Sequence, residues 1–317
     1  MNLYWPVYKT LESETLSLAR CIHFNEDHLQ VYSMTIANII VRCAIEIESI
    51  SKELYQGLSG VMNPVDENGQ PRDLYFDTDC LQLLEDRWKL SEKAIQVTTS
   101  EFYFEEDCNR VLTPLRKANK RGSSGCDWKR AYQAIKHSRV ASLPKATVKH
   151  LVRALGALFI LNLYYKDERF SLAEKQDGAF DPSVGSNIFS VFVARADEMS
   201  FNSTISDENI LPQTQTELPR SIYIRKYDES SLRAIHKNVS EMNRTLIERA
   251  AKSLVIANFR KSNPNKNFDN VCSLAMEAGG IELLRELFRG INIGPAFSAA
   301  HYEAVLNKSQ VIYPKLG

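Results

Sequence analysis

Apolar side chains recur at three- and four-residue steps along much of the chain, the pattern of helices with one buried face. The clearest case is the stretch 31–57, whose apolar residues fall on a single stripe: Ile36, Ile40, Cys43, Ile47, Ile50 and Leu54. The pattern predicts a second helix, capped by Asp77 or Asp79 and extending to about Thr99. These two helices would each bury one face in a shared core.

The most apolar part of the chain follows Pro144, a residue favoured in a first helical turn. Twelve uncharged residues lie between Arg153 and Lys166. A membrane-spanning helix needs about twenty apolar residues, so we expect a core helix here and no association with a membrane. Together these helices have enough apolar surface for a helical bundle.

The second half of the chain has a different pattern. Residues 188–194 and 221–227 predict strands, and 231–260 predicts a long helix. Two shorter helices are expected at 267–277 and 281–289, separated by a pair of glycines. This half is therefore expected to be helical or mixed α/β.

A stretch rich in Gly, Asp, Ser and Pro at 177–186 separates the two patterns and predicts a domain boundary. We expect a mainly α fold, with a helical bundle at 1–176 and a smaller helical or mixed α/β region at 177–317. The role of the second region does not follow from its pattern.

Composition supports an intracellular globular protein. The chain has 317 residues, of which 44% are hydrophobic and 25% charged. Its six cysteines form no C-x-x-C pair, which favours free thiols in a reducing compartment. The first residues lack a basic segment followed by an apolar one, the pattern of a secretory signal. We expect a cytoplasmic location.

Several common designs are absent from the sequence. It contains no P-loop, no dinucleotide-binding glycine motif, no H-E-x-x-H and no G-x-S-x-G. Cys21, His23 and His28 lie close together without a recognised ligand spacing. We therefore expect neither a metal nor a cofactor.

The net charge of zero conceals a strongly basic segment. Between Arg110 and Arg153 there are twelve Lys or Arg residues and one acid, Asp127. Such an excess attracts polyanions, although it could instead pair with the acidic stretch at 22–107 inside the fold. Five of these cations are candidates for contact with RNA or phosphate: Lys117, Lys120, Arg121, Lys136 and Arg139.

A short helix is predicted over Trp128–Ser138, with Asp127 as its N-cap. At 100° per residue, its apolar side chains share one face, and its candidate functional side chains share the other. The apolar face holds Trp128, Tyr132 and Ile135, and the opposite face holds Arg130, Gln133 and His137. The loop before the helix, 122–125, could hold a phosphate at the helix N-terminus or be a plain flexible connection.

Arginine and histidine together can cleave RNA without a metal. Histidine can exchange a proton with the 2′-hydroxyl or the leaving oxygen, because its pKa lies near neutral. A guanidinium offers planar donors to the charge that builds on phosphorus. Arg130 and His137 are about 10 Å apart along the axis, so one phosphodiester or a second copy of the helix could join them. The alternative is that both are ordinary residues on a solvated face.

The run Trp128–Arg139, followed by Ala146–Leu161, resembles prokaryotic HEPN-like helical proteins, as does the earlier Cys43–Leu54. The similarity covers roughly residues 10–168. It implies a bundle of four or five helices that forms a homodimer. In active members an R-x4–6-H motif from two protomers makes a metal-independent ribonuclease site, often in toxin–antitoxin or antiphage systems.

The resemblance assigns His137 as general acid and base and Arg130 as phosphate stabiliser, with Glu46 or Glu48, Tyr132 and Gln133 as possible supporting residues. A polar residue often follows the family's arginine, whereas here Ala131 does. A second alignment places Tyr132 at the arginine position, which would make the site degenerate. The two expected functions are therefore an endoribonuclease and a non-catalytic module. The module would bind a nucleotide, RNA or an acidic protein, and 177–317 could hold a protein partner.

Overall fold

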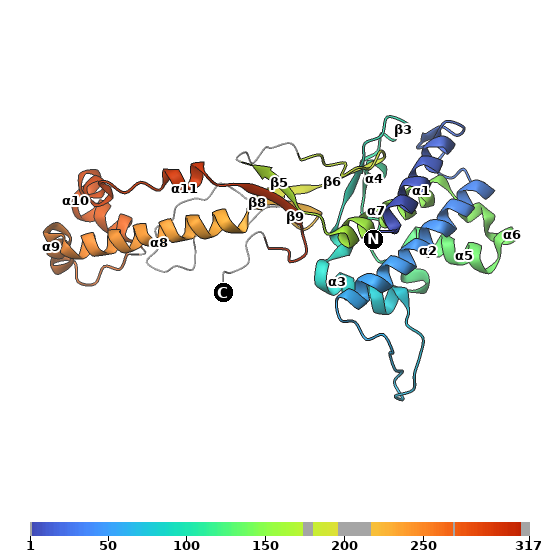
Figure 1. Cartoon of the computed structure of the whole chain (residues 1–317), viewed down its shortest axis with the longest axis horizontal. Helices are drawn as coiled ribbons and strands as arrows, with labels where there is room; N and C mark the ends of the chain where they lie inside the picture. The colour runs from blue at the N-terminus through green and yellow to red at the C-terminus, as the bar shows by residue number, and fades with distance from the viewer. Residues whose placement is uncertain (1, 174–179, 196–216, 269, 312–317) are drawn as a thin grey trace.

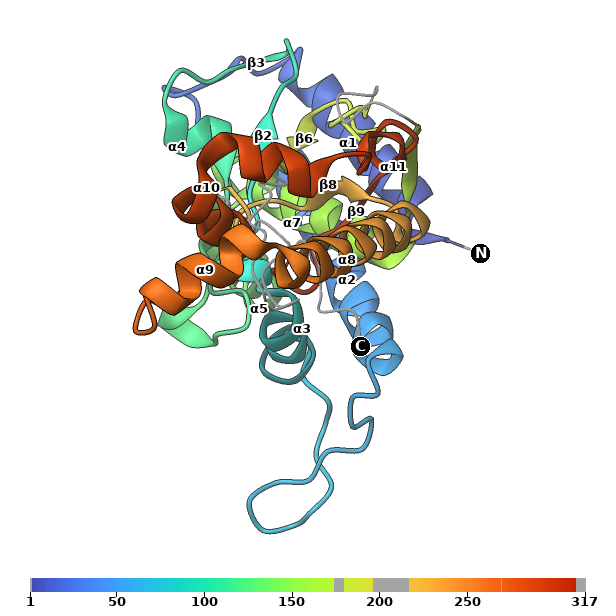
Figure 2. The same ribbon diagram turned by 90° about the vertical axis from the view of Figure 1, so that its left-hand side faces the viewer.

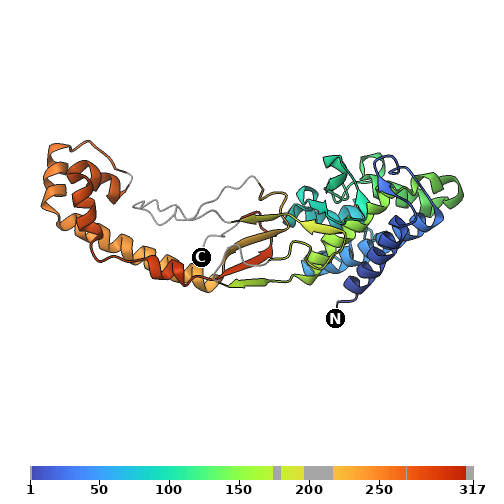
Figure 3. The same cartoon turned by 90° about the horizontal axis from the view of Figure 1, so that it is seen from above.

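The computed structural model describes residues 2–173, 180–195, 217–268 and 270–311. It is mainly helical with three small sheets among these residues. Figures 1 and 3 show an elongated chain, with a helical body at one end, a sheet beside it and a helical arm reaching away from both. None of the described helices is long and apolar enough to cross a membrane.

Four helices make the body: α1 (Tyr4–Ala19), α2 (Met34–Gly57), α5 (Asp127–His137) and α7 (Val148–Lys166). α7 is buried on nearly every side and packs against the other three. The stripe of α2 from Ile36 to Leu54 is buried as predicted. Pro144, expected in the first turn of this helix, lies in a 3₁₀ turn before it. Thr147 caps α7, since its hydroxyl accepts the His150 N–H.

The predicted helix ending near Thr99 is wrong in its second half. A π-helical turn, η1 (Phe76–Leu81), leads into α3 (Gln82–Trp88), and Lys89 ends α3 in the left-handed region at φ 53°. The residues beyond it form β2 (Ile95–Val97), which pairs with β4 (Val111–Leu112) and β6 (Phe189–Val191). β-branched side chains two residues apart suit this strand better than a helix.

A four-stranded sheet lies between the body and the arm. Its order is β5–β9–β8–β7, with β7 and β8 parallel and the other neighbours antiparallel: β5 (Phe170–Ala173), β7 (Val193–Arg195), β8 (Tyr223–Tyr227) and β9 (Tyr302–Leu306). The strand predicted at 221–227 is thus confirmed, whereas the single strand predicted at 188–194 is divided at Phe192 into β6 and β7, which belong to different sheets. The sequence also predicts a polar loop around 197–219 between these strands, and most of that range lies outside the described residues.

The predicted division at residue 177 does not mark an edge of the core. One apolar cluster extends from Tyr4 to Leu306, and β6 belongs to a sheet whose other strands precede the division. The buried Lys93 also donates to the carbonyl of Pro219 at 3.0 Å, and burial lowers its pKa to about 7. Strand pairing and apolar contact therefore tie part of the second half to the body.

A separate core begins in the arm, which contains α8 (Glu229–Lys252), α9 (Leu254–Ser262), α10 (Val271–Phe288) and α11 (Gly294–Ser298). The single helix predicted over 231–260 is interrupted at Ser253, which caps α9 through the Ile256 N–H. The break predicted at the glycine pair is confirmed, because Gly280 has φ 67° within α10. L side chains rarely adopt that backbone angle.

The remaining short elements lie along the chain between the longer helices and strands of the body. They are β1 (Phe24–Asn25), β3 (Phe102–Tyr103), α4 (Asp107–Arg110), α6 (Arg139–Ser142) and the 3₁₀ turns Leu90–Glu92, Gly122–Ser124 and Leu143–Lys145. Figures 1 and 2 both show the loop between α2 and α3 projecting from the body. This loop supplies part of the groove described next.

Candidate functional site

α5 presents the two faces predicted for it. Trp128, Tyr132 and Ile135 are each at most 3% exposed and pack into the core, whereas Arg130 and His137 are exposed on the other side. The predicted amphipathic helix is therefore confirmed. Its N-cap is Cys126 rather than Asp127, whose carboxylate instead accepts the Trp128 N–H and pairs with Arg153.

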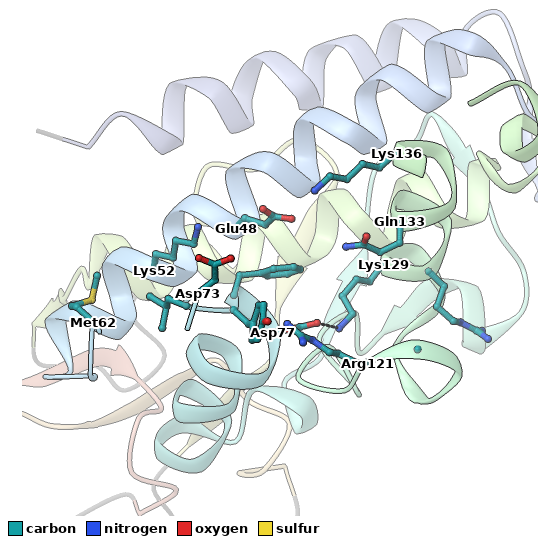
Figure 4. A pocket seen from close by; sticks show the side chains of 14 residues that line it. Glu48, Lys52, Met62, Asp73, Asp77, Arg121, Lys129, Gln133 and Lys136 are labelled. Carbon is teal, nitrogen blue, oxygen red and sulfur yellow. Dashed lines mark hydrogen bonds and ion pairs between the residues drawn. The ribbon is translucent and has the colours of Figure 1, made fainter. Parts of the chain in front are cut away.

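A groove of about 940 Å³, which we call the α2–α5 groove, runs between α2, α5 and the segments around residues 75 and 121. Five cations line it: Lys52, Arg121, Lys129, Arg130 and Lys136. Three acids line it as well: Glu48, Asp73 and Asp77. Figure 4 shows Lys52 and Lys136 on either side of Glu48. The groove is thus mixed in charge rather than uniformly basic.

Asp77 pairs with two of these cations at the floor of the groove. Its carboxylate accepts from Lys129 Nζ at 3.1 Å and from Arg121 Nε at 3.0 Å (Figure 4). Burial alone would raise the pKa of Asp77, but the Thr78 N–H, Lys129 and Arg121 outweigh burial and lower it. Lys129 is buried and also donates to the carbonyls of Ala118 and Lys120. Part of the basic segment is therefore paired internally.

Arg121, predicted as a phosphate contact, has a different environment from that expected. Its guanidinium carbon lies 3.7 Å from the centre of the Tyr75 ring, a stacking distance. Arg72 lies 5.3 Å from the same ring and pairs with Asp79. Tyr75 and Arg121 both line the groove, so together they form a layer along its wall.

Tyr132 and Glu48 join α5 to α2. The Tyr132 hydroxyl donates to Glu48 Oε1 at 3.1 Å, and burial, with the nearby Glu48 charge, raises the pKa of Tyr132 to about 12. A buried tyrosine held in this way contributes to helix packing. Glu48 and Gln133 line the groove, whereas Glu46 does not. Glu46 lies near Arg42, and burial raises its pKa; the supporting role expected for Glu46 stays a prediction.

A second groove of about 630 Å³, which we call the α5 N-terminal groove, adjoins the first at Arg130. Arg116, Lys117, Arg130 and Arg153 line it with a single acid, Asp127. Arg153 pairs with Asp127. Arg116, Lys117 and Arg130 pair with no carboxylate among the described residues. This groove carries the greater excess of positive charge.

The other predicted residues lie around these grooves. Lys136 lines the α2–α5 groove with its Nζ 5.7 Å from the Tyr132 ring. Lys120 lies 3.5 Å from the Gln82 amide oxygen, and Arg139 donates to Asn38 at 3.0 Å. His137 is exposed and lines neither groove. Within one chain, Arg130 and His137 therefore share neither of these two grooves.

Sequence reasoning missed Asp77 and Tyr75 as residues of this site. Both lie in the acidic half of the chain, more than forty positions before Arg121 and Lys129. The acidic run opposite the basic segment was the only available signal. It indicated internal pairing as an alternative without identifying the partners.

The described His, Cys, Asp and Glu side chains form no group of three or more that could hold a metal ion. Comparisons of the chain with protein-family models, with curated proteins and with solved structures gave no match.

Proposed function

We propose that the protein binds the phosphate backbone of RNA along the exposed side of α5. The observation that carries this proposal is the α5 N-terminal groove, where Arg116, Lys117 and Arg130 have no carboxylate partner among the described residues. Unpaired cations gathered in one concave surface attract phosphate strongly, because the surrounding protein limits screening by water. The resemblance to HEPN-like proteins favours RNA as the polyanion. That resemblance includes segments outside this groove, such as Cys43–Leu54.

The two grooves meet at Arg130, which favours a polymer over a single small anion. A chain of nucleotides can place one phosphate near Arg116 and Lys117 and the next near Arg130 and Lys136. A mononucleotide would fill only one of the grooves. An acidic protein is the competing ligand, and salt dependence alone would not separate it from RNA.

Charge reversal should test this surface. We expect the double variant Arg116→Glu, Lys117→Glu to weaken RNA binding at least tenfold and to reduce the salt slope by about one for each lost phosphate contact. The measurement is anisotropy of a labelled RNA over a series of salt concentrations. A matched double reversal on α8, Lys237→Glu with Lys252→Glu, should leave the affinity unchanged. Equal affinity of both double variants would contradict the proposal.

Metal-independent cleavage of RNA is the second candidate function, favoured by one observation. Arg130 and His137 share the exposed face of α5, and neither pairs with another described side chain. We propose that two copies of the chain bring Arg130 of one protomer near His137 of the other across a two-fold axis. The histidine would then move the proton while the guanidinium holds the phosphate.

The cleavage proposal predicts activity in EDTA that two substitutions remove. His137→Ala and Arg130→Lys should each lower the rate about a hundredfold or more, since a lysine ammonium cannot replace the planar guanidinium. Both variants should keep the parent unfolding midpoint, because the two side chains are exposed. Light scattering should give the mass of a dimer. A monomer, or an active His137→Ala, would refute this composite site and leave RNA binding as the proposed function.

A further inference from the structure

The Tyr75–Arg121 layer has the geometry of a stacking surface. Arg121 lies 3.7 Å above the centre of the ring, and its Nε donates to Asp77 at 3.0 Å. These two contacts hold the guanidinium plane in place. Tyr75 is 38% exposed and the Arg121 side chain 47%. Both line the α2–α5 groove, so part of the layer is open to a ligand in the groove.

The charges around this layer are unsuited to a phosphate. Asp77 pairs with Arg121, and the carboxylates of Glu48 and Asp73 also line the groove. Carboxylates repel phosphate but accept hydrogen bonds from N–H groups. A flat, uncharged group with N–H donors on its edge could stack on this layer and donate hydrogen bonds to these carboxylates. Nucleobases have these properties, and they stack on aromatic rings and on guanidinium planes.

Unpaired cations lie elsewhere along the same groove. Arg130 and Lys136 line it together with the Gln133 amide. The groove therefore combines a stacking layer, acceptors for a base edge and cations for a phosphate. Its volume of about 940 Å³ lies toward the upper end of ligand-sized pockets, roughly 300–1,000 Å³.

We propose that the α2–α5 groove takes one unstacked base of a single-stranded RNA. The base stacks against the Tyr75–Arg121 layer, and the attached phosphate lies toward Arg130 and Lys136. This inference rests on the proposed RNA binding and adds a preference for single-stranded RNA. Duplex RNA, whose bases are stacked and paired, cannot present a base to this groove.

The test compares two ligands of equal charge. One is a short single-stranded 2′-O-methyl RNA, which cannot be cleaved through its 2′ oxygen, and the other is an abasic oligomer of the same length. The full-length protein should bind the first ligand roughly fivefold to a hundredfold more tightly. Tyr75→Leu should remove most of this difference while leaving affinity for the abasic oligomer unchanged. Arg121→Lys keeps the positive charge but removes the planar guanidinium, so it should also reduce the difference in affinity between the two ligands.

Matched substitutions outside the groove serve as controls. Tyr103→Leu removes another exposed tyrosine, and Arg72→Lys alters the other arginine beside Tyr75; neither residue lines the groove. Both should preserve the preference for the RNA with bases. Thermal unfolding of every variant shows whether lost binding reflects lost structure. If Tyr75→Leu does not fold, the effect of Arg121→Lys on the difference in affinity tests the proposal instead.

The outcomes separate this inference from the function on which it rests. If the parent protein binds both ligands equally and Tyr75→Leu changes neither affinity, the base pocket is refuted while backbone binding stands. If the parent protein binds neither ligand, RNA binding itself fails and the inference fails with it. If a free nucleoside monophosphate displaces the RNA at comparable concentration, the groove is a mononucleotide site instead.

Discussion

Trp128→Ala should destabilise the protein by about 3–5 kcal/mol, as expected for truncating a large buried aromatic side chain. Trp128 is 1% exposed and is the largest of the fully buried side chains among the described residues. Its Nε1–H donates to the Pro114 carbonyl at 2.8 Å, so the substitution also leaves that carbonyl without its donor. The free energy of unfolding in urea measures the loss, which should appear as a lower midpoint.

Trp128→Phe separates the two contributions. It keeps most of the apolar area and should cost less than the alanine variant, because its main loss is the hydrogen bond to Pro114. His137→Ala on the same helix is the control and should leave the midpoint unchanged, since that side chain is exposed. A parent-like midpoint for Trp128→Ala would mean that α5 does not pack as described.

Local patterns predicted three of the four body helices and did not predict α1. α2 and α5 each bury one apolar stripe with the period of the helix, and α7 is an almost continuous apolar run, so one sequence sufficed to place these three. The strand at Ile95–Val97 was missed because its partners, β4 and β6, lie far along the chain. Three residues of alternating pattern do not distinguish a strand from the end of a helix.

The candidate site was predictable only in part. The helical period placed Arg130 and His137 on one exposed face of α5, which the structure confirms. The same period did not reveal that Lys129 is buried, because position 129 lies at the flank of the apolar face. Its burial depends on Asp77, fifty-two residues earlier. Ion pairs between distant segments depend on tertiary packing, which a count of charges does not provide.

Asp77→Ala should destabilise the protein by about 3–5 kcal/mol, because it leaves an unpaired ammonium inside the fold. Lys129 is 3% exposed, and without the carboxylate its Nζ would retain only the carbonyls of Ala118 and Lys120. Arg121 adds less to the cost, since its exposed guanidinium can turn to water. Chemical denaturation of the parent and the variant at neutral pH measures the difference.

The double variant Asp77→Ala, Lys129→Met separates the cost of losing the Asp77–Lys129 ion pair from the cost of leaving an unpaired, buried Lys129 ammonium. Methionine fills a similar volume without a charge, so the double variant should recover much of the stability lost by Asp77→Ala alone. If it recovers none, the packing of Asp77 matters more than its charge.

Acid provides an independent check on the charge of Asp77. The pKa of Asp77 is lower in the folded protein than in the unfolded chain, where it is about 3.9. The unfolded chain therefore binds more protons as the pH falls below about 4, and the stabilisation from this carboxylate is lost in that range. Asp77→Ala lacks this titration. The stability gap between parent and variant should be constant from neutral pH down to about 5 and should narrow below about 4. A gap that stays constant into acid would show that the Asp77 charge does not stabilise the fold.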